Sequence, residues 1–249
     1  MNVLHKILFP KFTWWLWLLI PLTFFGFNPT YFSKIFTGLP SIFHIHVFFM
    51  VLWIAMILIQ PWLIFKKKTK LHKTLGKFSY ILMPLVLLTT WLMIRHSYFK
   101  FIADETSKMA SEGKNITANE MILNAAEYMN IGVLYWLWLG IFYSLAVVNR
   151  KKIVLHATFM FAAILTLLGP TVDRIIIPYF IKYNLEVNFF ITTFILIDLI
   201  LATLLIYQWK KRLPPKAAMT ALGIYLIGQA VFFIFPRIYL WKILIDPFN

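Results

Sequence analysis

The chain contains no cysteine among its 249 residues, and it is poor in acidic side chains. Without thiols it forms no disulfide, no thiolate-ligated metal site and no iron–sulfur cluster of its own. Only nine residues are Asp or Glu against 24 Lys and Arg, which gives a formal net charge of +15. Such an excess suits contact with nucleic acid or with anionic lipid, and the positions of the charges decide between the two.

Several catalytic signatures are missing as well. The sequence has no G-x-x-x-x-G-K-[ST] phosphate-binding loop and no H-E-x-x-H metalloprotease helix. A retinal protein needs a lysine inside its last membrane helix, but Lys216 lies at the edge of the last apolar stretch and Lys242 lies beyond it. These absences exclude P-loop nucleotide hydrolysis, proteolysis of that zinc type and retinal photochemistry.

Apolar residues, by contrast, make up 61% of the chain, and its mean hydropathy is +0.78. A helix needs roughly 20 mostly apolar residues to cross a bilayer, and the strand alternation of a membrane barrel is absent. Backbone groups in hydrocarbon must bond within their own segment, so the spans are helices. The sequence predicts one domain, an all-α integral membrane bundle of seven transmembrane helices over residues 12–28, 42–65, 77–96, 129–149, 153–177, 189–209 and 217–235.

The basic residues are distributed unevenly along these spans. Lys and Arg near span ends are retained on the cytoplasmic side, so clusters without acids mark that side. We therefore expect a multi-pass protein of the bacterial cytoplasmic (inner) membrane, with a cytoplasmic N-terminus and a periplasmic C-terminus. We expect anionic lipid headgroups at the cytoplasmic face as its partners, and no nucleic acid. The four clusters are Lys6/Lys11, Lys66–Lys77, Arg150–Lys152 and Lys210–Lys216.

Two further patterns concern the organisation of the chain. Residues 100–120 form the one long polar segment and are expected to be an external loop. The pattern K-x-x-L-H occurs twice, ending at His72 and at His156, and each copy opens an outward-going span and is followed by a proline, Pro84 or Pro170. This repetition suggests that helices 2–3 and helices 4–5 are duplicated hairpins.

The same residues carry a family resemblance over about residues 42–178. The chain resembles a family of uncharacterised bacterial polytopic membrane proteins that show an L-H-[RK]-x-x-G-[RK]-x-x-Y hairpin and a later H-x-x-[WF]-M segment ending near an Arg. Here these are Leu71–Tyr80, His156–Met160 and Arg174, with Phe43–His46 and Gln60-Pro61 upstream. Ala157 departs from the basic residue usual after the later His. The resemblance implies a multi-helix membrane fold and brings no reaction. The distribution of His is also loosely similar to that of transmembrane di-haem cytochromes b.

Most of the six histidines fall at span ends, in two layers. His72 and His156 lie close to cytoplasmic basic clusters, and we expect both to face the bundle interior. Counting 1.5 Å per helical residue places a second set at one depth near the outer surface. This outer set is His46, His96, Glu127 and Asp173. His44 is two residues from His46, about 200° around an α-helix, and is not expected to join.

These layers admit three interpretations. Imidazoles with one or two carboxylates suit a bare transition metal ion (Zn, Cu, Fe or Mn), which fits the outer set. His72 and His156, on helices 3 and 5, could flank a haem b, whereas His46 and His96 lie on one tight hairpin that suits a bare ion better. In the third interpretation each imidazole only binds a backbone carbonyl, a headgroup or water.

Asp198 lies twelve residues before Lys210, about 18 Å into the bilayer and near its midplane. A carboxyl at that depth is costly unless it faces a partner or water, so we expect it to face the bundle, to be hydrogen-bonded and to be a candidate proton relay. The leading hypothesis is a metal- or haem-binding protein of envelope redox chemistry with a membrane redox partner, acting in electron transfer or respiratory-enzyme assembly. The alternatives are a proton-coupled transporter using Asp198 and the outer layer, or a structural subunit without a cofactor.

Overall fold

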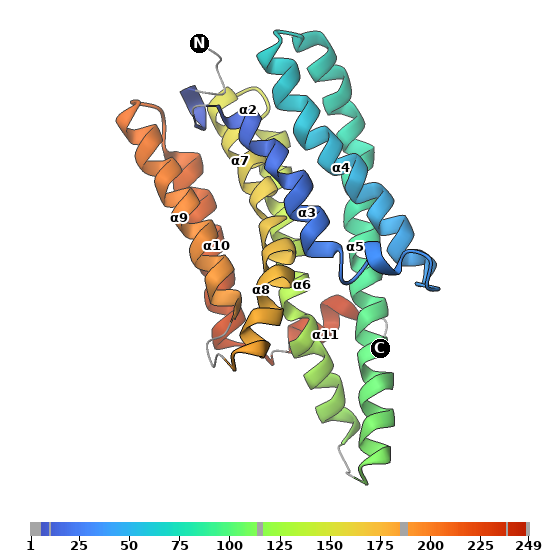
Figure 1. Ribbon diagram of the computed structural model, residues 1–249. Helices are drawn as coiled ribbons and strands as arrows, with labels where there is room; N and C mark the ends of the chain where they lie inside the picture. The colour runs from blue at the N-terminus through green and yellow to red at the C-terminus, as the bar shows by residue number, and fades with distance from the viewer. Residues whose placement is uncertain (1–5, 10, 114–116, 185–188, 238, 248–249) are drawn as a thin grey trace.

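The computed structural model describes residues 6–9, 11–113, 117–184, 189–237 and 239–247, and all regular structure in this part of the chain is helical. Six helices are long and apolar enough to cross a membrane, as a helical membrane bundle requires. They lie side by side along one direction (Figure 1). The six are α4 (Ser41–Phe65), α5 (Thr69–Ser111), α6 (Ala118–Val148), the continuous pair α7 (Ile153–Leu165) and α8 (Leu168–Lys182), α9 (Phe189–Lys210) and α10 (Lys216–Ile234).

The predicted first span is present as a shorter apolar helical stretch, Phe12–Phe27. It consists of α2 (Phe12–Trp15), a 3-10 turn η1 (Leu16–Leu18) and α3 (Leu19–Phe27), and a second 3-10 turn η2 (Phe32–Lys34) follows. Sixteen residues rise about 24 Å, less than the ~30 Å of a hydrocarbon core. This stretch packs against α8, so it belongs to the bundle, but its length sets it apart from the other six.

A break divides the fifth predicted span into α7 and α8. A proline inside a helix removes one backbone donor and crowds the carbonyl four residues earlier. Pro170 therefore disfavours regular α-helix at Thr166, and the chain turns there, with the Leu167 N–H bonding to the Ile164 carbonyl instead. Proline is well tolerated in the first turn of the new helix, where α8 has it.

The segment predicted as an external polar loop is helical over most of its described length. α5 continues without interruption to Ser111, so its 43 residues rise about 65 Å, twice a bilayer core. α6 begins at Ala118 with a capping box, in which the Thr117 side chain accepts from the Glu120 N–H and the Glu120 carboxylate accepts from the Thr117 N–H. The ends of α5 and α6 form an arm that extends beyond the rest of the bundle (Figure 1).

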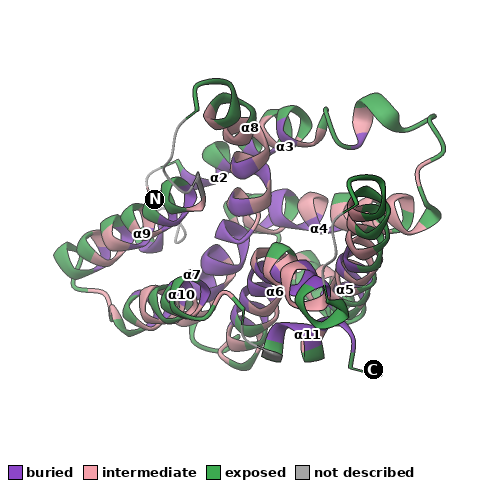
Figure 2. Ribbon diagram, turned by 90° about the horizontal axis from the view of Figure 1, so that it is seen from below, coloured by how far each residue is buried: buried purple, intermediate pink, exposed green. Residues whose placement is uncertain are grey.

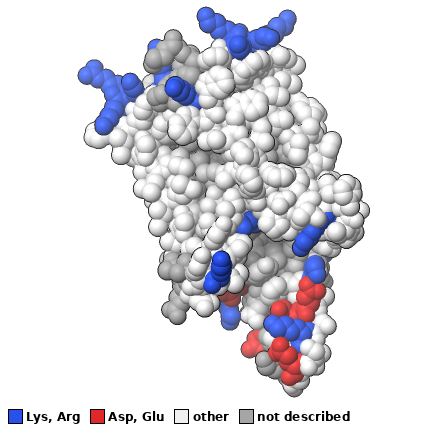
Figure 3. All heavy atoms as spheres, in the orientation of Figure 1, with Lys and Arg blue, Asp and Glu red and all other residues white. Residues whose placement is uncertain are grey.

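Charge separates the two ends of the molecule. The α4–α5, α6–α7 and α9–α10 turns lie at the same end as the N-terminus (Figure 1), and in the view of Figure 3 this end carries Lys and Arg without Asp or Glu. At the other end, acidic and basic side chains mix on the arm. We call the first the basic end and the second the mixed end. Their separation is the one that the predicted topology requires.

The core lies around the α7–α8 pair, which is the most buried of the six long spans. Figure 2 shows buried residues on the faces that the helices turn toward one another and exposed residues on the outer faces. Three glycines, Gly26, Gly169 and Gly228, allow close crossings at the half nearer the mixed end. A Cβ at Gly26 of α3 would lie 2.7 Å from the Thr171 carbonyl oxygen, and one at Gly169 of α8 would lie 2.0 Å from the Tyr135 ring.

A short C-terminal helix, α11 (Tyr239–Ile245), packs on α6 and α5 near the mixed end. Trp91 Nε1 donates to the Leu244 carbonyl at 2.8 Å, and the Arg95 guanidinium bonds to the buried Asp246 carboxylate at 3.1 Å. On the other side, Asn130 Nδ2 donates to the Pro236 carbonyl at 3.3 Å. These contacts fasten the chain after α10 across the α5–α6 pair.

Candidate functional site

His72 and His156 occupy equivalent positions in the two hairpins. Each is the fourth residue of its helix, α5 or α7, and each donates its backbone N–H to the carbonyl of the lysine that precedes the helix, Lys68 or Lys152. The K-x-x-L-H repeat is thus also a structural repeat at the basic end. The two imidazoles are half-buried and lie within electrostatic reach of each other.

Each of these imidazoles is held by the helix before its own. His156 Nδ1 lies 2.8 Å from the Ala146 carbonyl of α6, and a carbonyl only accepts, so Nδ1 carries the proton. His72 contacts the side-chain amide of Gln60 on α4. Only one orientation of this amide pairs donors with acceptors. In that orientation the amide nitrogen donates to His72 Nδ1 and to the His72 carbonyl, and the amide oxygen accepts from the Gly76 N–H at 3.0 Å.

These contacts bear on haem ligation. A bis-imidazole haem needs an unprotonated ligating nitrogen on both rings. His156 offers one at Nε2, because its proton is on Nδ1. A neutral His72 that accepts from Gln60 at Nδ1 carries its proton on Nε2 instead. The donor set of the basic end therefore fits a haem at one ring and not at the other.

The four predicted outer ligands have separate surroundings. His46 Nδ1 lies 3.5 Å from Thr89 Oγ1 between α4 and α5. His96 packs edge-on against Phe43, and its Nε2 is buried without a hydrogen-bond partner among the described residues. His44 is also set apart from these two, since its Nδ1 bonds to the Tyr31 hydroxyl at 3.0 Å.

The two outer carboxylates are engaged elsewhere. Glu127 accepts from Arg237 Nε at 2.6 Å, and this hydrogen bond raises the pKa of the Arg237 guanidinium above its usual value. Asp173 is buried against Tyr135 and Thr193. In the part of the chain that the structure describes, no three His, Cys, Asp or Glu residues come together in a group that could hold a metal ion. The four residues that the sequence places at equal depth therefore do not form a shared site in this structure.

Asp173 instead anchors a polar cluster of three helices. Its Oδ2 accepts from the Tyr135 hydroxyl of α6 at 3.2 Å, and its Oδ1 accepts from Thr193 Oγ1 of α9. Gly169 lies one turn earlier on α8, and its missing side chain leaves the space that the Tyr135 ring fills. The fold therefore orients the Tyr135 hydroxyl toward the carboxylate.

Arg174, the next residue, is held on another side of α8. Its Nη1 donates to the Pro170 carbonyl at 2.7 Å, and the guanidinium lies 4.6 Å from the centre of the Phe27 ring. It is within electrostatic reach of both Asp173 and His46. A guanidinium beside His46 disfavours a metal cation at that imidazole, because like charges repel.

Asp198 faces a neighbouring helix, as expected. Gln229 Nε2 of α10 donates to Asp198 Oδ1 of α9 at 3.0 Å, and both residues lie at least partly inside the bundle. The buried Tyr225, one turn earlier on α10, is within electrostatic reach of Asp198 and also of Tyr135. Its hydroxyl donates to the Ala162 carbonyl of α7 at 2.9 Å.

These acidic and hydroxyl groups follow one another through the bundle. Starting near the mixed end, Asp173 bonds to Tyr135. Tyr135 is within electrostatic reach of Tyr225, and Tyr225 is within electrostatic reach of Asp198. Helical rise places Asp198 about 18 Å before the basic cluster at the end of α9, and Asp173 about 30 Å after the basic cluster at the start of α7. We call Asp173, Tyr135, Tyr225, Asp198 and Gln229 the acidic line.

Tyr135, Tyr225, Thr193 and Gln229 are not among the site residues predicted from the sequence, and Gln60 is part of the family resemblance only. One signal was present for the amides. The chain has only three glutamines, Gln60, Gln208 and Gln229, and all three lie inside predicted spans. An amide in hydrocarbon must find a partner on another helix, so each marks an interhelical contact. In the structure Gln208 donates to Thr158 Oγ1 at 2.9 Å and to the Ile7 carbonyl at 3.2 Å.

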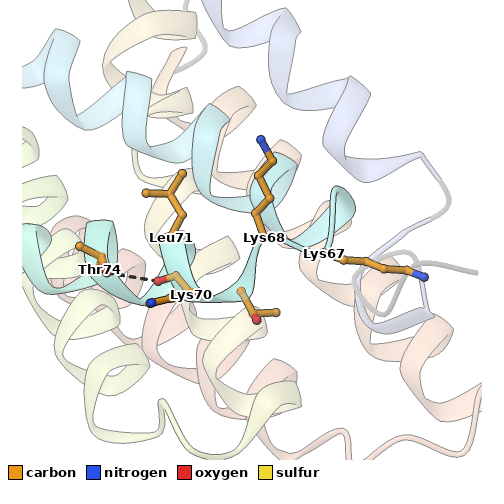
Figure 4. A pocket seen from close by; sticks show the side chains of 6 residues that line it. Lys67, Lys68, Lys70, Leu71 and Thr74 are labelled. Carbon is orange, nitrogen blue, oxygen red and sulfur yellow. Dashed lines mark hydrogen bonds between the residues drawn. The ribbon is translucent and has the colours of Figure 1, made fainter.

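A shallow hollow of about 470 Å³ lies at the α4–α5 turn of the basic end, lined by Lys67, Lys68, Thr69, Lys70, Leu71 and Thr74. Its lysines do not converge, since Lys67 and Lys68 point in different directions (Figure 4). The Thr74 hydroxyl bonds to the Lys70 carbonyl of its own helix at 3.2 Å. The hollow is therefore a solvated basic surface and not a shaped site.

Comparison of the chain with protein-family models, with curated proteins and with solved structures found no match. The family resemblance accordingly rests on the motif residues alone.

Proposed function

We propose that this protein is a proton-coupled membrane transporter that passes protons along the acidic line. The observation that carries the proposal is that two carboxyl groups, Asp173 and Asp198, lie inside an apolar bundle, with Tyr135 bonded to Asp173 and Tyr225 within electrostatic reach of both Tyr135 and Asp198. Ionisable residues within membrane spans are costly and mark ion pathways or proton relays. In this proposal the two carboxyls, the tyrosine hydroxyls near them and water between these groups give a proton a sequence of sites from the mixed end to the bilayer midplane.

The chemistry of the line suits protons better than a metal ion. Tyrosine hydroxyls both donate and accept, whereas the ligands of a cation must present lone pairs only. Asp173 accepts hydrogen bonds from two hydroxyl groups, and Asp198 accepts one from an amide. In each carboxyl group at least one oxygen is therefore held by a hydrogen bond. Each carboxyl can then hold a proton on one oxygen while keeping a hydrogen bond.

The proposed setting is the bacterial cytoplasmic membrane, with the basic end in the cytoplasm. Counting Phe12–Phe27 as a membrane segment gives the seven spans of the sequence prediction and a C-terminus on the far side. The separation of charge between the basic and mixed ends supports this orientation, because Lys and Arg clusters are retained inside. Anionic lipid headgroups are the proposed partners of the basic end.

Redox chemistry through a metal ion or haem stays a prediction with less support. Its outer carboxylates, Glu127 and Asp173, are engaged by other partners, and a neutral His72 that accepts from Gln60 does not present a lone pair at Nε2. An absorption spectrum and elemental analysis of the purified protein test it directly. A Soret band lost in His156→Ala would replace the proton proposal with haem binding.

Proton movement is tested with the purified full chain in vesicles that enclose a pH-sensitive dye. An imposed membrane potential drives protons inward, and the initial rate of dye response is measured. We expect a rate well above that of protein-free vesicles, and a loss on the order of a hundredfold in Asp198→Asn, which keeps the shape but carries no exchangeable acid proton.

Asp104→Asn is the matched control, because Asp104 is an exposed carboxylate on the arm paired with Lys100. It should conduct like the wild type. A wild-type rate equal to that of empty vesicles, or a normal rate in Asp198→Asn, would reject the proposed function.

A further inference from the structure

The imidazoles at the basic end are not part of the acidic line, yet they carry a defined arrangement of protons. We propose that His72 and His156 form a complementary proton donor and acceptor pair, with Nε2–H of His72 donating and Nε2 of His156 accepting, and that water exchanges protons with this pair at the cytoplasmic end of the pathway. The assignment of protons as the cargo rests on the proposed function. The assignment of tautomers stands on the contacts alone.

The His156 assignment follows from its carbonyl partner. Nδ1 is 2.8 Å from the Ala146 carbonyl, so Nδ1–H is the donor of that bond. In the neutral ring the other nitrogen, Nε2, then has a free lone pair. A proton that arrives at Nε2 makes an imidazolium whose Nδ1–H remains on the carbonyl, and the same proton leaves again from Nε2. His156 therefore loads and unloads at one atom while its ring stays in place.

The His72 assignment follows from the amide partner. The Gln60 oxygen is taken by the Gly76 N–H at 3.0 Å, which leaves the amide nitrogen to donate to His72 Nδ1. The neutral ring then carries its proton on Nε2. If His72 gains a second proton at Nδ1, the Gln60 amide must turn over so that its oxygen accepts. Gln60 is thus a positioning residue that ties the charge of His72 to its own orientation.

The location of the pair suits exchange with water. Both rings are half-buried, and they lie within one or two turns of the basic clusters that open α5 and α7. The charged groups near His72 are Lys73 on its own helix and His156 on α7. Deeper in the bundle, the Ser79 hydroxyl of α5 and the Tyr143 hydroxyl of α6 are 2.8 Å apart, and Ser79 also donates to the Gly76 carbonyl. Polar groups therefore continue from the pair into the bundle.

The tautomers are measured directly by nitrogen NMR of the full chain, labelled with ¹⁵N-histidine, in lipid bilayers at a pH where the rings are neutral. We expect the Nδ1–H tautomer for His156 and the Nε2–H tautomer for His72, each assigned by the signal lost in His156→Ala or His72→Ala. Gln60→Leu should abolish the preference of His72, whereas Gln208→Leu, which removes a span glutamine elsewhere, should not. An Nδ1–H tautomer on both rings would overturn the pair and would instead fit two ligating Nε2 atoms.

The role in proton exchange is measured in the dye-filled vesicles. His72→Ala and His156→Ala should each lower the initial rate on the order of tenfold or more. His44→Ala is the control, because His44 bonds to Tyr31 far from the pair and should leave the rate unchanged. Normal rates in both variants with slow rates in Asp198→Asn would reject this inference and keep the proposed function. A normal rate in Asp198→Asn would reject the proposed function while the tautomers still test the pair.

Discussion

The basic end and the mixed end of the bundle are held together by different physical means. At the basic end, Lys and Arg gather on turns of three or four residues between α4 and α5 and between α6 and α7, without nearby acids. At the mixed end, charges pair, as in Arg95–Asp246 and Arg237–Glu127, and the chain adds the arm and α11. These ion pairs of the mixed end join separate elements, whereas the Lys and Arg of the basic end are the charges from which we propose the orientation.

The space around a glycine also differs between the two ends, as Gly76 and Gly169 show. Near the basic end, Gly76 has room, because the closest neighbouring atom to an added Cβ is the Gln60 amide at 4.0 Å. Toward the mixed end, Gly169 has none, because the Tyr135 ring occupies that space. We therefore expect a single substitution near the basic end to change stability little, and one at a contact between helices near the mixed end to change it more. The predictions below test this difference.

The largest effect is expected from Gly169→Ala. A methyl group 2.0 Å from the Tyr135 ring cannot fit without moving that ring or α8. Overpacking typically costs 1–3 kcal/mol and occasionally more, so we expect a loss of about 3 kcal/mol in the free energy of unfolding, measured by denaturation in detergent. Displacement of Tyr135 should also slow proton uptake in vesicles, because its bond to Asp173 is lost.

Gly76→Ala is the matched control at the basic end. A methyl group fits there, and alanine favours a helix interior over glycine by up to about 1 kcal/mol. Unchanged or slightly higher stability is expected. Equal losses in the two variants would show that the two ends are packed alike.

A smaller effect is expected from Arg95→Ala. Removing one partner of a fully buried pair costs about 3–5 kcal/mol, but Arg95 is a third exposed and water screens it, so we expect about 1–2 kcal/mol. The contact also holds α11, so protease cleavage after α10 should become faster. Stability equal to wild type would mean that Trp91 and the packing of α11 hold the segment without the ion pair.

A third effect, smaller again, is expected on the arm. Lys100 and Asp104 pair one turn apart and both are about 60% exposed. Lys100→Ala should lower the stability by only about 0.3–0.5 kcal/mol, because exposed pairs of this spacing contribute that much. Added salt should reduce the difference between the variant and the wild type. A loss above that of Arg95→Ala would contradict the distinction between exposed and joining ion pairs.

Reporter fusions should leave stability unchanged and test orientation alone. Fusions after Lys70, Lys152 and Arg212 should be cytoplasmic, and one at Gly113 on the arm should be periplasmic, because the basic clusters are retained inside. The expected periplasmic position of Asn249 lies outside the described residues. A cytoplasmic reporter at Gly113 would reverse the assignment of the two ends.

The sequence located the helices well where apolar length and proline decide. The predicted spans 42–65, 189–209 and 217–235 differ from α4, α9 and α10 by at most one residue at either end. The polar segment 100–120 was misjudged as a loop because its helices have no apolar stripe to reveal them. Its helical signals are local: spaced ion pairs such as Lys100–Asp104, and the capping box of Thr117 and Glu120.

The candidate site was predicted less completely. Asp198 was predicted to face inward because a carboxyl is unfavourable in lipid near the midplane. His72 and His156 were singled out by the K-x-x-L-H repeat and the family pattern. The outer metal site is not assembled, because equal depth left the facing directions of His46, His96, Glu127 and Asp173 open. Tyr135 and Tyr225 were missed because aromatic residues are common in membrane helices and their hydroxyl partners lie far away in sequence.

The sequence by itself determined which segments are apolar helices, how long they are and which ends are basic, because these properties accumulate along the chain one residue at a time. Only the tertiary structure decided which polar side chains meet. Asp173 reaches Tyr135 rather than His46 because Gly169 lets α8 lie against α6 at that turn. Depth in a membrane follows from counting residues, but the neighbour across an interface depends on the rotation and crossing of two helices, which side-chain packing sets.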